Sequence, residues 1–246
     1  MILQCPDHLI STSKAVALQN DEVHVWIAHL DEPCHDKLFD ALSCVEQARA
    51  DRFHFERDRR RFRLGRLRLR QILARYLVRP PGHLRFRYGR WGKPELDSPF
   101  SRSGLRFNLS HSNEIALYAV TRHRKVGIDI ERVRPIEVEQ LARRFFSRLE
   151  SQALCALGYE SKNSAFLRCW TGKEAFLKAL GDGMHRALDS FAVSVSPRGP
   201  GRLLYDRDDP QGAARWSLFG LNGIPGYVAS IATQGRVSRV VRRRYE

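Results

Sequence analysis

The sequence predicts an α+β fold, because each half of the chain runs through helical segments first and strand segments afterwards. One long segment in each half has the apolar spacing of an amphipathic helix, and short strand-like runs follow it. The 246 residues, of which 43% are hydrophobic, suffice for one large domain or two of ordinary size. No sequence repeat proves that the two halves are copies of each other.

The composition predicts a cytoplasmic protein. Residues 1–14 lack the basic start and apolar run of a signal peptide, and no apolar run reaches the length that spans a bilayer. The five cysteines are odd in number and include no CxxC pair. This pattern favours reduced thiols over a disulfide framework or a zinc site.

The formal net charge of +15 is the main anomaly of the composition. It predicts an anionic partner, whether a nucleic acid, a phosphorylated ligand, an acidic protein or a membrane surface. Arginine greatly outnumbers lysine, and its planar fork suits bidentate phosphate contacts. A GC-rich coding sequence would also favour arginine, so this ratio is a weak argument for a phosphate ligand.

The first half begins with a predicted strand at residues 23–30 and a predicted helix at 36–50. Residues 52–77 are predicted to form a long, arginine-rich helix that ends before a Pro-Pro-Gly turn. Its apolar positions follow the spacing i, i+3, i+4 and i+7: Leu69, Ile72, Leu73 and Tyr76. The polar face, with Arg66 and Arg70, is either a solvated surface or an anion-binding wall, and the sequence leaves both open.

Two polar motifs follow this helix. After a predicted strand at residues 84–88, the stretch Gly92-Lys93-Pro94 presents its lysine on a stiff loop. Residues 107–112 (Phe-Asn-Leu-Ser-His-Ser) form the second motif. Ser110 and His111 are adjacent and lie outside a G-x-S-x-G elbow, so they suit phosphate binding better than a hydrolase triad.

A boundary between two halves is predicted near the middle of the chain. A buried strand at residues 115–120 is followed by a polar, basic connection at residues 121–125. We therefore expect an N-terminal half at residues 1–122 and a C-terminal half at residues 123–246.

The stretch at residues 126–131 (Val-Gly-Ile-Asp-Ile-Glu) alternates apolar and acidic side chains. Ile128 and Ile130 can enter a core, while Asp129 and Glu131 share the opposite face of a strand. Neighbouring carboxylates repel each other unless a cation lies beside them, and Mg²⁺ often takes only one or two protein carboxylates. Two surface acids on a solvated edge strand would give the same pattern, so this stretch alone leaves both interpretations open.

The second half continues with a predicted helix at residues 135–146 and a capping box in which Ser147 pairs with Glu150. This pairing gives Glu150 a structural explanation. Further strands are expected at residues 191–195, 216–219 and 227–232, and the basic tail at residues 236–244 is expected to be a solvated end.

Residues 166–180 are predicted to form a strong helix that ends at the Gly-Asp-Gly of residues 181–183. Glu174 and Lys178 lie four residues apart and project from one face of it. They form either a surface ion pair worth a few tenths of a kcal/mol, or a third metal carboxylate with an ammonium beside the bound phosphate.

Four stretches in this order resemble the 4′-phosphopantetheinyl transferases of the surfactin-synthetase-activating (Sfp) type: residues 92–94, 107–112, 126–131 and 170–179 (Trp-Thr-Gly-Lys-Glu-Ala-Phe-Leu-Lys-Ala). Arg144-Phe145-Phe146-Ser147 with Glu150 is a fifth, looser match. The resemblance covers roughly residues 45–195. The last two of the four stretches are specific in combination, whereas the single pieces are not.

This resemblance implies a fold of two similar halves related by a pseudo-twofold axis, each a small antiparallel sheet with helices. Coenzyme A would lie in the cleft between the halves. The implied reaction transfers the phosphopantetheine arm of coenzyme A to a serine of an apo carrier protein and releases 3′,5′-ADP. It requires Mg²⁺.

The resemblance also implies roles for individual residues. The metal ligands would be Asp129, Glu131 and Glu174. The catalytic groups would be Glu174, Lys178 and Glu131, and the proton of the attacking serine would pass to Glu131, to Glu174 or to a metal-bound water. The coenzyme A contacts would be Arg49, Arg61, Lys93, Pro94, Ser110, His111 and Lys178, with the two arginines chosen from a loosely aligned region.

The expected protein partner is an apo acyl or peptidyl carrier protein, whose acidic recognition helix would suit the positive charge of this chain. A monomer is expected, because a two-half chain contains its paired architecture internally. A basic nucleic-acid-binding protein is the alternative from another class, but it leaves the three spaced acids unexplained. A Mg²⁺-dependent nuclease that uses the same acids has no other support.

Overall fold

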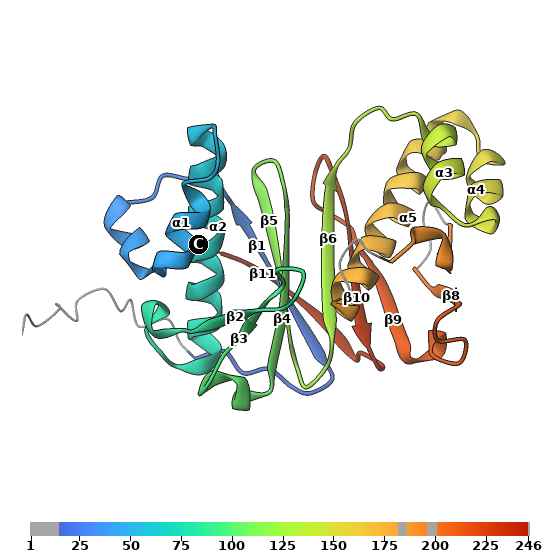
Figure 1. The fold of residues 1–246 in the computed structure, drawn as a ribbon. Helices are drawn as coiled ribbons and strands as arrows, with labels where there is room; N and C mark the ends of the chain where they lie inside the picture. The colour runs from blue at the N-terminus through green and yellow to red at the C-terminus, as the bar shows by residue number, and fades with distance from the viewer. Residues whose placement is uncertain (1–14, 182–185, 196–200, 246) are drawn as a thin grey trace, which may run out of the picture.

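The computed structural model describes residues 15–181, 186–195 and 201–245. The predicted helix end at Asp182 and Gly183, the N-terminal stretch and Cys5 therefore lie outside the described residues. Two groups of strands lie between two groups of helices, with the helices of the first half on one side and those of the second half on the other (Figure 1). The predicted α+β fold is confirmed.

The first half contains a four-stranded sheet in the order β11-β1-β5-β4, in which β11 (Arg239–Arg244) comes from the end of the chain, and a separate two-stranded hairpin, β2-β3. Its elements are β1 (Glu22–His29), the 3-10 helix η1 (Asp36–Ala41), α1 (Cys44–Ala50), α2 (Glu56–Leu77), β2 (Phe86–Tyr88), β3 (Pro94–Leu96), β4 (Leu105–Ser112) and β5 (Ile115–Arg122). The predicted helix at residues 36–50 is thus divided in two, and β3 occupies part of the predicted loop.

The second half contains a three-stranded antiparallel sheet in the order β6-β10-β9 and a hairpin, β7-β8. Its elements are β6 (Val126–Arg132), α3 (Val138–Phe145), α4 (Arg148–Cys155), α5 (Tyr159–Leu180), β7 (Phe191–Val193), β8 (Leu203–Asp206), β9 (Trp216–Leu221), β10 (Tyr227–Gln234) and β11 (Arg239–Arg244). Helix α5 begins seven residues before the predicted start at residue 166.

The two halves repeat one arrangement, as the pseudo-twofold fold requires. In each half a strand leads to two short helices, a helix of 22 residues, a two-stranded hairpin and two further strands. The strand orders β1-β5-β4 and β6-β10-β9 correspond, with antiparallel pairing in both.

The same buried ion pair recurs in both halves. Glu46 in α1 and Glu150 in α4 are capping-box glutamates, as predicted for Glu150, and each binds the fifteenth residue of the following long helix. Arg70 contacts Glu46 at 2.6 Å, and the Lys173 Nζ contacts Glu150 at 2.7 Å. All four side chains are at most 2% exposed. The two interpretations of Arg70 as solvated or anion-binding are therefore both wrong.

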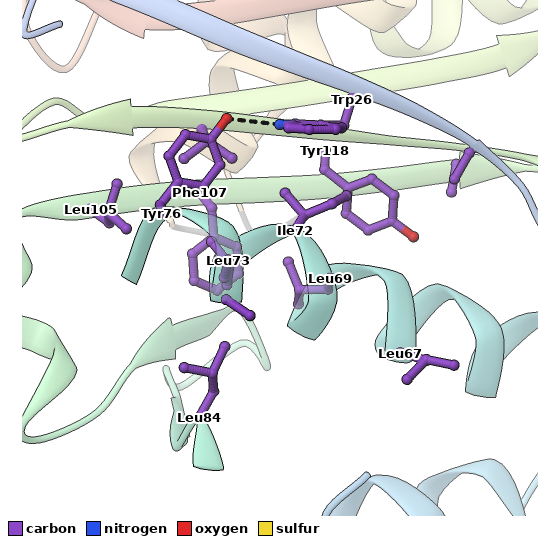
Figure 2. Packing of buried hydrophobic residues seen from close by; sticks show 14 of the residues in the cluster. Trp26, Leu67, Leu69, Ile72, Leu73, Tyr76, Leu84, Leu105, Phe107 and Tyr118 are labelled. Atoms are coloured by element: carbon purple, nitrogen blue, oxygen red, sulfur yellow. Dashed lines mark hydrogen bonds between the residues drawn. The ribbon is translucent and has the colours of Figure 1, made fainter. Parts of the chain in front are cut away.

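The apolar face of α2 lies against the first sheet, as its spacing predicts. Leu69, Ile72, Leu73 and Tyr76 are buried in one cluster with Trp26 of β1. Figure 2 shows these side chains between helix and sheet, with the Trp26 indole Nε1 donating a hydrogen bond to the Tyr76 hydroxyl at 2.8 Å. This packing fixes α2 relative to β4 and β5.

A second core joins the two sheets. Ile128 and Ile130 of β6 are buried in a cluster with Val23 of β1, Leu117 of β5 and Ile231 of β10. The predicted alternation of β6 is confirmed, because its isoleucines enter this core while Asp129 and Glu131 take the other face. None of the helices in the described part of the chain is both long and apolar enough to cross a membrane.

The basic tail is not the solvated end that its sequence predicts. Residues 239–244 form β11, which pairs in parallel with β1 and brings the end of the chain beside α2 (Figure 1). The Tyr245 hydroxyl donates to the Gln71 side-chain oxygen at 2.8 Å. β11 completes the edge of the first sheet through its backbone, although most of its residues are arginines. Its pairing partner β1 lies far away in the sequence, so local composition cannot predict this pairing.

Candidate functional site

A cavity of about 560 Å³ lies between the two halves and is lined by residues of both. This volume lies within the range of small-molecule sites. The first half contributes α1, α2, β4 and the loop before β3, and the second half contributes the last turns of α5. The lining contains seven of the predicted site residues: Arg49, Arg61, Lys93, Pro94, His111, Glu174 and Lys178.

Lys178 connects the cavity to two of the three predicted residues that do not line it, Asp129 and Ser110, and it does not bind the third, Glu131. Its ammonium donates to the Asp129 Oδ1 at 2.6 Å and to the Ser110 hydroxyl at 2.9 Å. Ser110 also donates to the same carboxylate oxygen at 2.9 Å. Three stretches that lie far apart in sequence, on β4, β6 and α5, therefore meet at this point.

A glycine makes that meeting possible. A Cβ atom at Gly127 would lie 2.0 Å from the backbone oxygen of Ala175, so only glycine lets α5 pack directly on β6. This close approach brings the helix face with Glu174 and Lys178 to the acidic face of the strand.

Asp129 and Glu174 each keep a buried carboxylate oxygen without a hydrogen-bond partner, Oδ2 in the first and Oε1 in the second. Buried unpaired oxygens are costly, and a bound cation would satisfy them. Among the described residues, however, no group of three or more His, Cys, Asp or Glu side chains is arranged to hold a metal ion by itself. Mg²⁺ does not need such a group, because water and phosphate oxygens often complete its shell. The residues therefore fit a magnesium ion that shares its ligands with a phosphorylated substrate.

The acids influence one another electrostatically. Burial raises the pKa of Glu174 above its ordinary value, and the negative charge of Asp129 raises this pKa further. Burial and the charge of Asp129 likewise raise the pKa of Glu131. The positive charge of Lys178 opposes both shifts. A divalent cation would act in the same direction as Lys178, because it favours the ionised carboxylates.

Lys93 points toward the second half of the molecule. Its ammonium donates to the backbone oxygen of Lys178 and, at 3.4 Å, to that of Val126. Burial lowers the pKa of Lys93 to about 8, and the nearby charges of Lys125 and Arg106 contribute to this shift. The predicted coenzyme A lysine thus also ties the loop before β3 to the end of α5.

The basic side of the cavity contains two arginines with different surroundings. Arg61 forms a two-point ion pair with Asp31, with its Nε 2.7 Å from Oδ1. The Arg49 guanidinium lies 5.7 Å from the ring centre of Phe62 and forms no ion pair within the described part of the chain. Desolvation lowers the pKa of His111, and the charges of Lys178 and Arg61 lower it further.

Sequence reasoning missed part of the cavity and of its surroundings. Arg66, predicted only as part of a polar face, lines the cavity while its Nε contacts Glu46 at 2.9 Å. Asn108 also lines it, and Ser112 contacts Glu131. Asn108 and Ser112 alternate with Ser110 along β4, so the period of two in a strand was the signal that could have identified them.

Comparison with known proteins gives a consistent result over most of the chain. Residues 125–232 match the family described as "4'-phosphopantetheinyl transferase superfamily". Residues 31–123 match the family described as "4'-phosphopantetheinyl transferase, N-terminal". The two matches adjoin each other between β5 and β6.

Three curated relatives carry the same description. The 4'-phosphopantetheinyl transferase HetI of Nostoc sp. is 44% identical over 224 residues, which cover 89% of this chain and 91% of the relative. The enzyme psf-1 of Bacillus pumilus is 34% identical over 81% of this chain and 82% of its own length. The enzyme Sfp of Bacillus subtilis is 31% identical over 71% of this chain and 78% of its own length.

Proposed function

Because this chain belongs to the 4′-phosphopantetheinyl transferases, we propose that its cavity binds coenzyme A and that its acids bind Mg²⁺. The enzyme transfers the phosphopantetheine arm of coenzyme A to a carrier protein. The observation that carries the residue assignment is the convergence of Asp129, Glu174 and Lys178 beside a cavity shared by both halves.

The reaction is a phosphoryl transfer to a hydroxyl group. The serine oxygen of the carrier attacks the β-phosphorus of coenzyme A, an oxygen–phosphorus bond forms, and the bond from this phosphorus to the bridging oxygen breaks. The leaving group is 3′,5′-ADP, and the serine proton passes to Glu131, to Glu174 or to a water molecule between them and the serine. Negative charge accumulates on the phosphate oxygens, so preorganised positive charge is the main catalytic requirement.

Asp129, Glu131 and Glu174 would hold the Mg²⁺ ion, which when bound supplies charge neutralisation and polarisation of the diphosphate. The Lys178 ammonium lies at the cavity wall and would offset the charge that develops on the leaving phosphate. Its hydrogen bond to Asp129 keeps it beside the acids before the substrate arrives. Pro94 stiffens the loop that carries Lys93.

The basic side of the cavity is proposed to bind the 3′-phosphate of coenzyme A. Arg49 is better suited to this role than Arg61, because Asp31 already neutralises Arg61. His111 lines the same cavity, where the charges of Lys178 and Arg61 act on it, and it can donate a hydrogen bond to a phosphate oxygen.

Several broader features belong to the same proposal. The carrier is proposed to be an acidic acyl or peptidyl carrier protein, which the charge of +15 would attract.

A monomer is supported by the two halves within one chain. The boundary at residues 122 and 123 is supported by family matches that end at residue 123 and begin at 125. Free thiols at Cys34, Cys44, Cys155 and Cys169 support a cytoplasmic enzyme.

The direct test is mass spectrometry of an apo carrier protein incubated with this enzyme, coenzyme A and Mg²⁺. We expect the carrier to gain one phosphopantetheine group. Chelation of the metal should stop the reaction, and added Mg²⁺ should restore it. Asp129→Ala and Glu174→Ala should each lower the rate by about 100-fold or more. The matched control Glu139→Ala removes an exposed acid that pairs with Lys162 and should retain the rate.

Lys178→Ala separates transfer from binding. The turnover number should fall much more than the affinity for coenzyme A measured by calorimetry, because the ammonium acts mainly on the leaving phosphate. Equal losses of turnover and affinity would contradict this role. Full activity of Asp129→Ala would overturn the proposed metal site as a whole.

A further inference from the structure

The edge strands β4 and β6 lie side by side at the boundary between the halves (Figure 1). They belong to different sheets, in which each is an end strand, so no backbone ladder joins them. Their contact is nevertheless close and ordered, because side chains of β4 bind β6 at regular intervals. The edge of a sheet normally leaves backbone groups unpaired, and these need partners when they are buried.

Three alternate residues of β4 bind β6 through their side chains. The Asn108 side-chain oxygen accepts a hydrogen bond from the Ile128 backbone nitrogen at 2.8 Å. Two residues later, Ser110 donates to Asp129. Two residues further, the Ser112 hydroxyl donates to the Glu131 Oε2 at 3.4 Å and accepts from the backbone nitrogen of Arg132 at 3.1 Å. The contacts advance in parallel along both strands.

This arrangement replaces a backbone ladder with a side-chain ladder. Its outer members, Asn108 and Ser112, hold backbone nitrogens of β6 on either side of Asp129. The position of β6 within its own sheet is set by its pairing with β10, and these two bonds hold Asp129 and Glu131 at a defined place relative to β4 of the first half. Ser112 also contacts the Glu131 Oε2 directly, and this contact does not involve the Oε1 of the same carboxylate.

We propose that Ser112 is a positioning residue for Glu131, and that Asn108 fixes the register of β6 for the same purpose. This inference rests on the proposed role of Glu131 at the metal. Within the part of the chain that the structure describes, Ser112 neither lines the cavity nor binds Lys178, so its effect on the reaction passes through Glu131. Hydrogen bonds that orient metal-binding carboxylates commonly change metal affinity or activity by 10-fold to 100-fold when they are removed.

The test begins with Ser112→Ala. We expect the turnover number to fall about tenfold and the dissociation constant of Mn²⁺ to rise about tenfold, with Mn²⁺ binding followed by electron paramagnetic resonance with coenzyme A present and no carrier protein. The KM for coenzyme A should stay within about twofold of the wild-type value, because the cavity wall is intact. Ser112→Thr keeps the hydroxyl on a strand that tolerates β-branched residues, and should restore both quantities.

Ser217→Ala is the matched control. Ser217 lies on β9, at the other edge of the second sheet, and donates to the Gly235 backbone oxygen at 2.8 Å. Its removal also deletes one hydroxyl hydrogen bond, but it should leave Mn²⁺ affinity and turnover unchanged. A similar loss in both serine variants would mean a general effect on the sheet and would overturn the positioning role.

A double-mutant comparison identifies the route of the effect. In a Glu131→Gln background, Ser112→Ala should cause no further loss of Mn²⁺ affinity, because the group that it positions is already altered. An additional full loss would show that Ser112 does not act through Glu131. If Glu131→Gln itself binds Mn²⁺ and turns over normally, the proposed metal site fails. If only Ser112→Ala is normal, the metal site stands and the positioning role fails.

Discussion

Buried carboxylate oxygens without partners are costly to a protein, and Glu174 has one of them. Burial and the charge of Asp129 raise the pKa of Glu174, so the ionised form of this side chain opposes folding in the metal-free protein. The folded state then binds more protons than the unfolded state between the ordinary value of 4.5 and the raised one. The contribution of Glu174 to stability therefore falls as pH rises through this interval.

Glu174→Gln should accordingly stabilise the metal-free enzyme at pH 7 while it abolishes transfer. We expect a gain of about 1 kcal/mol in the free energy of unfolding, measured with a chelator present. The gain should shrink as pH is lowered toward 4.5 and the wild-type carboxylate becomes protonated. Glu139→Gln is the control of opposite sign, because the ion pair with Lys162 lowers the pKa of Glu139. A metal-free Glu174→Gln enzyme that is less stable than the wild type would contradict this account.

At the scale of elements, each long helix is held to a short capped helix through one buried glutamate: Glu46 pairs with Arg66 and Arg70 of α2, and Glu150 pairs with Lys173 of α5. Breaking such a pair by removing one partner is more damaging than the pair is stabilising, because it leaves an uncompensated buried charge. Lys173 also donates a hydrogen bond to the Phe191 backbone oxygen at 2.7 Å, and this bond attaches β7 to α5. This attachment keeps the helix that carries Glu174 and Lys178 in place.

Lys173→Met should therefore lower the free energy of unfolding by about 3–5 kcal/mol. Arg70→Met, its counterpart in the first half, should cause a smaller loss, because Arg66 still pairs with Glu46 at 2.9 Å and compensates its charge. Lys162→Met removes a lysine of the same helix whose partner Glu139 is 53% exposed, and it should cost less than about 1 kcal/mol. Chemical denaturation of the three variants measures these differences. Equally small losses of unfolding free energy in all three variants would show that the buried ion pairs do not hold the long helices to the short ones.

At the scale of the whole molecule, the proposed active site belongs to neither half alone. The cavity has walls from α2 and from α5, and the apolar core between the sheets holds these walls together. The return of β11 to the first sheet links the two halves once more. The excess of positive charge is also a property of the whole chain, and it acts over longer distances than any single contact.

The rate of reaction with an acidic carrier protein should consequently depend on salt. We expect kcat/KM for the carrier to fall by about tenfold between low and high ionic strength, because screening weakens electrostatic steering. The turnover number at saturating carrier should change much less. Coenzyme A is also anionic, so its affinity is measured separately at each salt concentration and held saturating. A carrier rate that is insensitive to salt would remove the proposed use of the net charge.

Local sequence was sufficient to predict the elements whose own pattern of apolar and polar residues shows which side chains are buried. The spacing of Leu69, Ile72, Leu73 and Tyr76 predicted the buried face of α2, and the alternation in β6 predicted which side chains enter the core. The capping box at Glu150 was readable because cap and partner are three residues apart. Four motifs in order were enough to predict the family, which the relatives confirm.

Only the tertiary structure decided what depends on residues far apart in the chain. Composition alone placed Arg66 and Arg70 on a polar face, but both are buried in ion pairs with Glu46. The basic residues of β11 were predicted to be a solvated end, but they pair with β1 at the edge of the first sheet. The side-chain ladder from β4 to β6 likewise needs two strands brought together from different sheets. The pattern of residues within one element shows which side chains are buried. The partners of a side chain on other elements are decided by how the elements pack together. The candidate site consists of such contacts between elements, and the sequence alone therefore could not give its geometry.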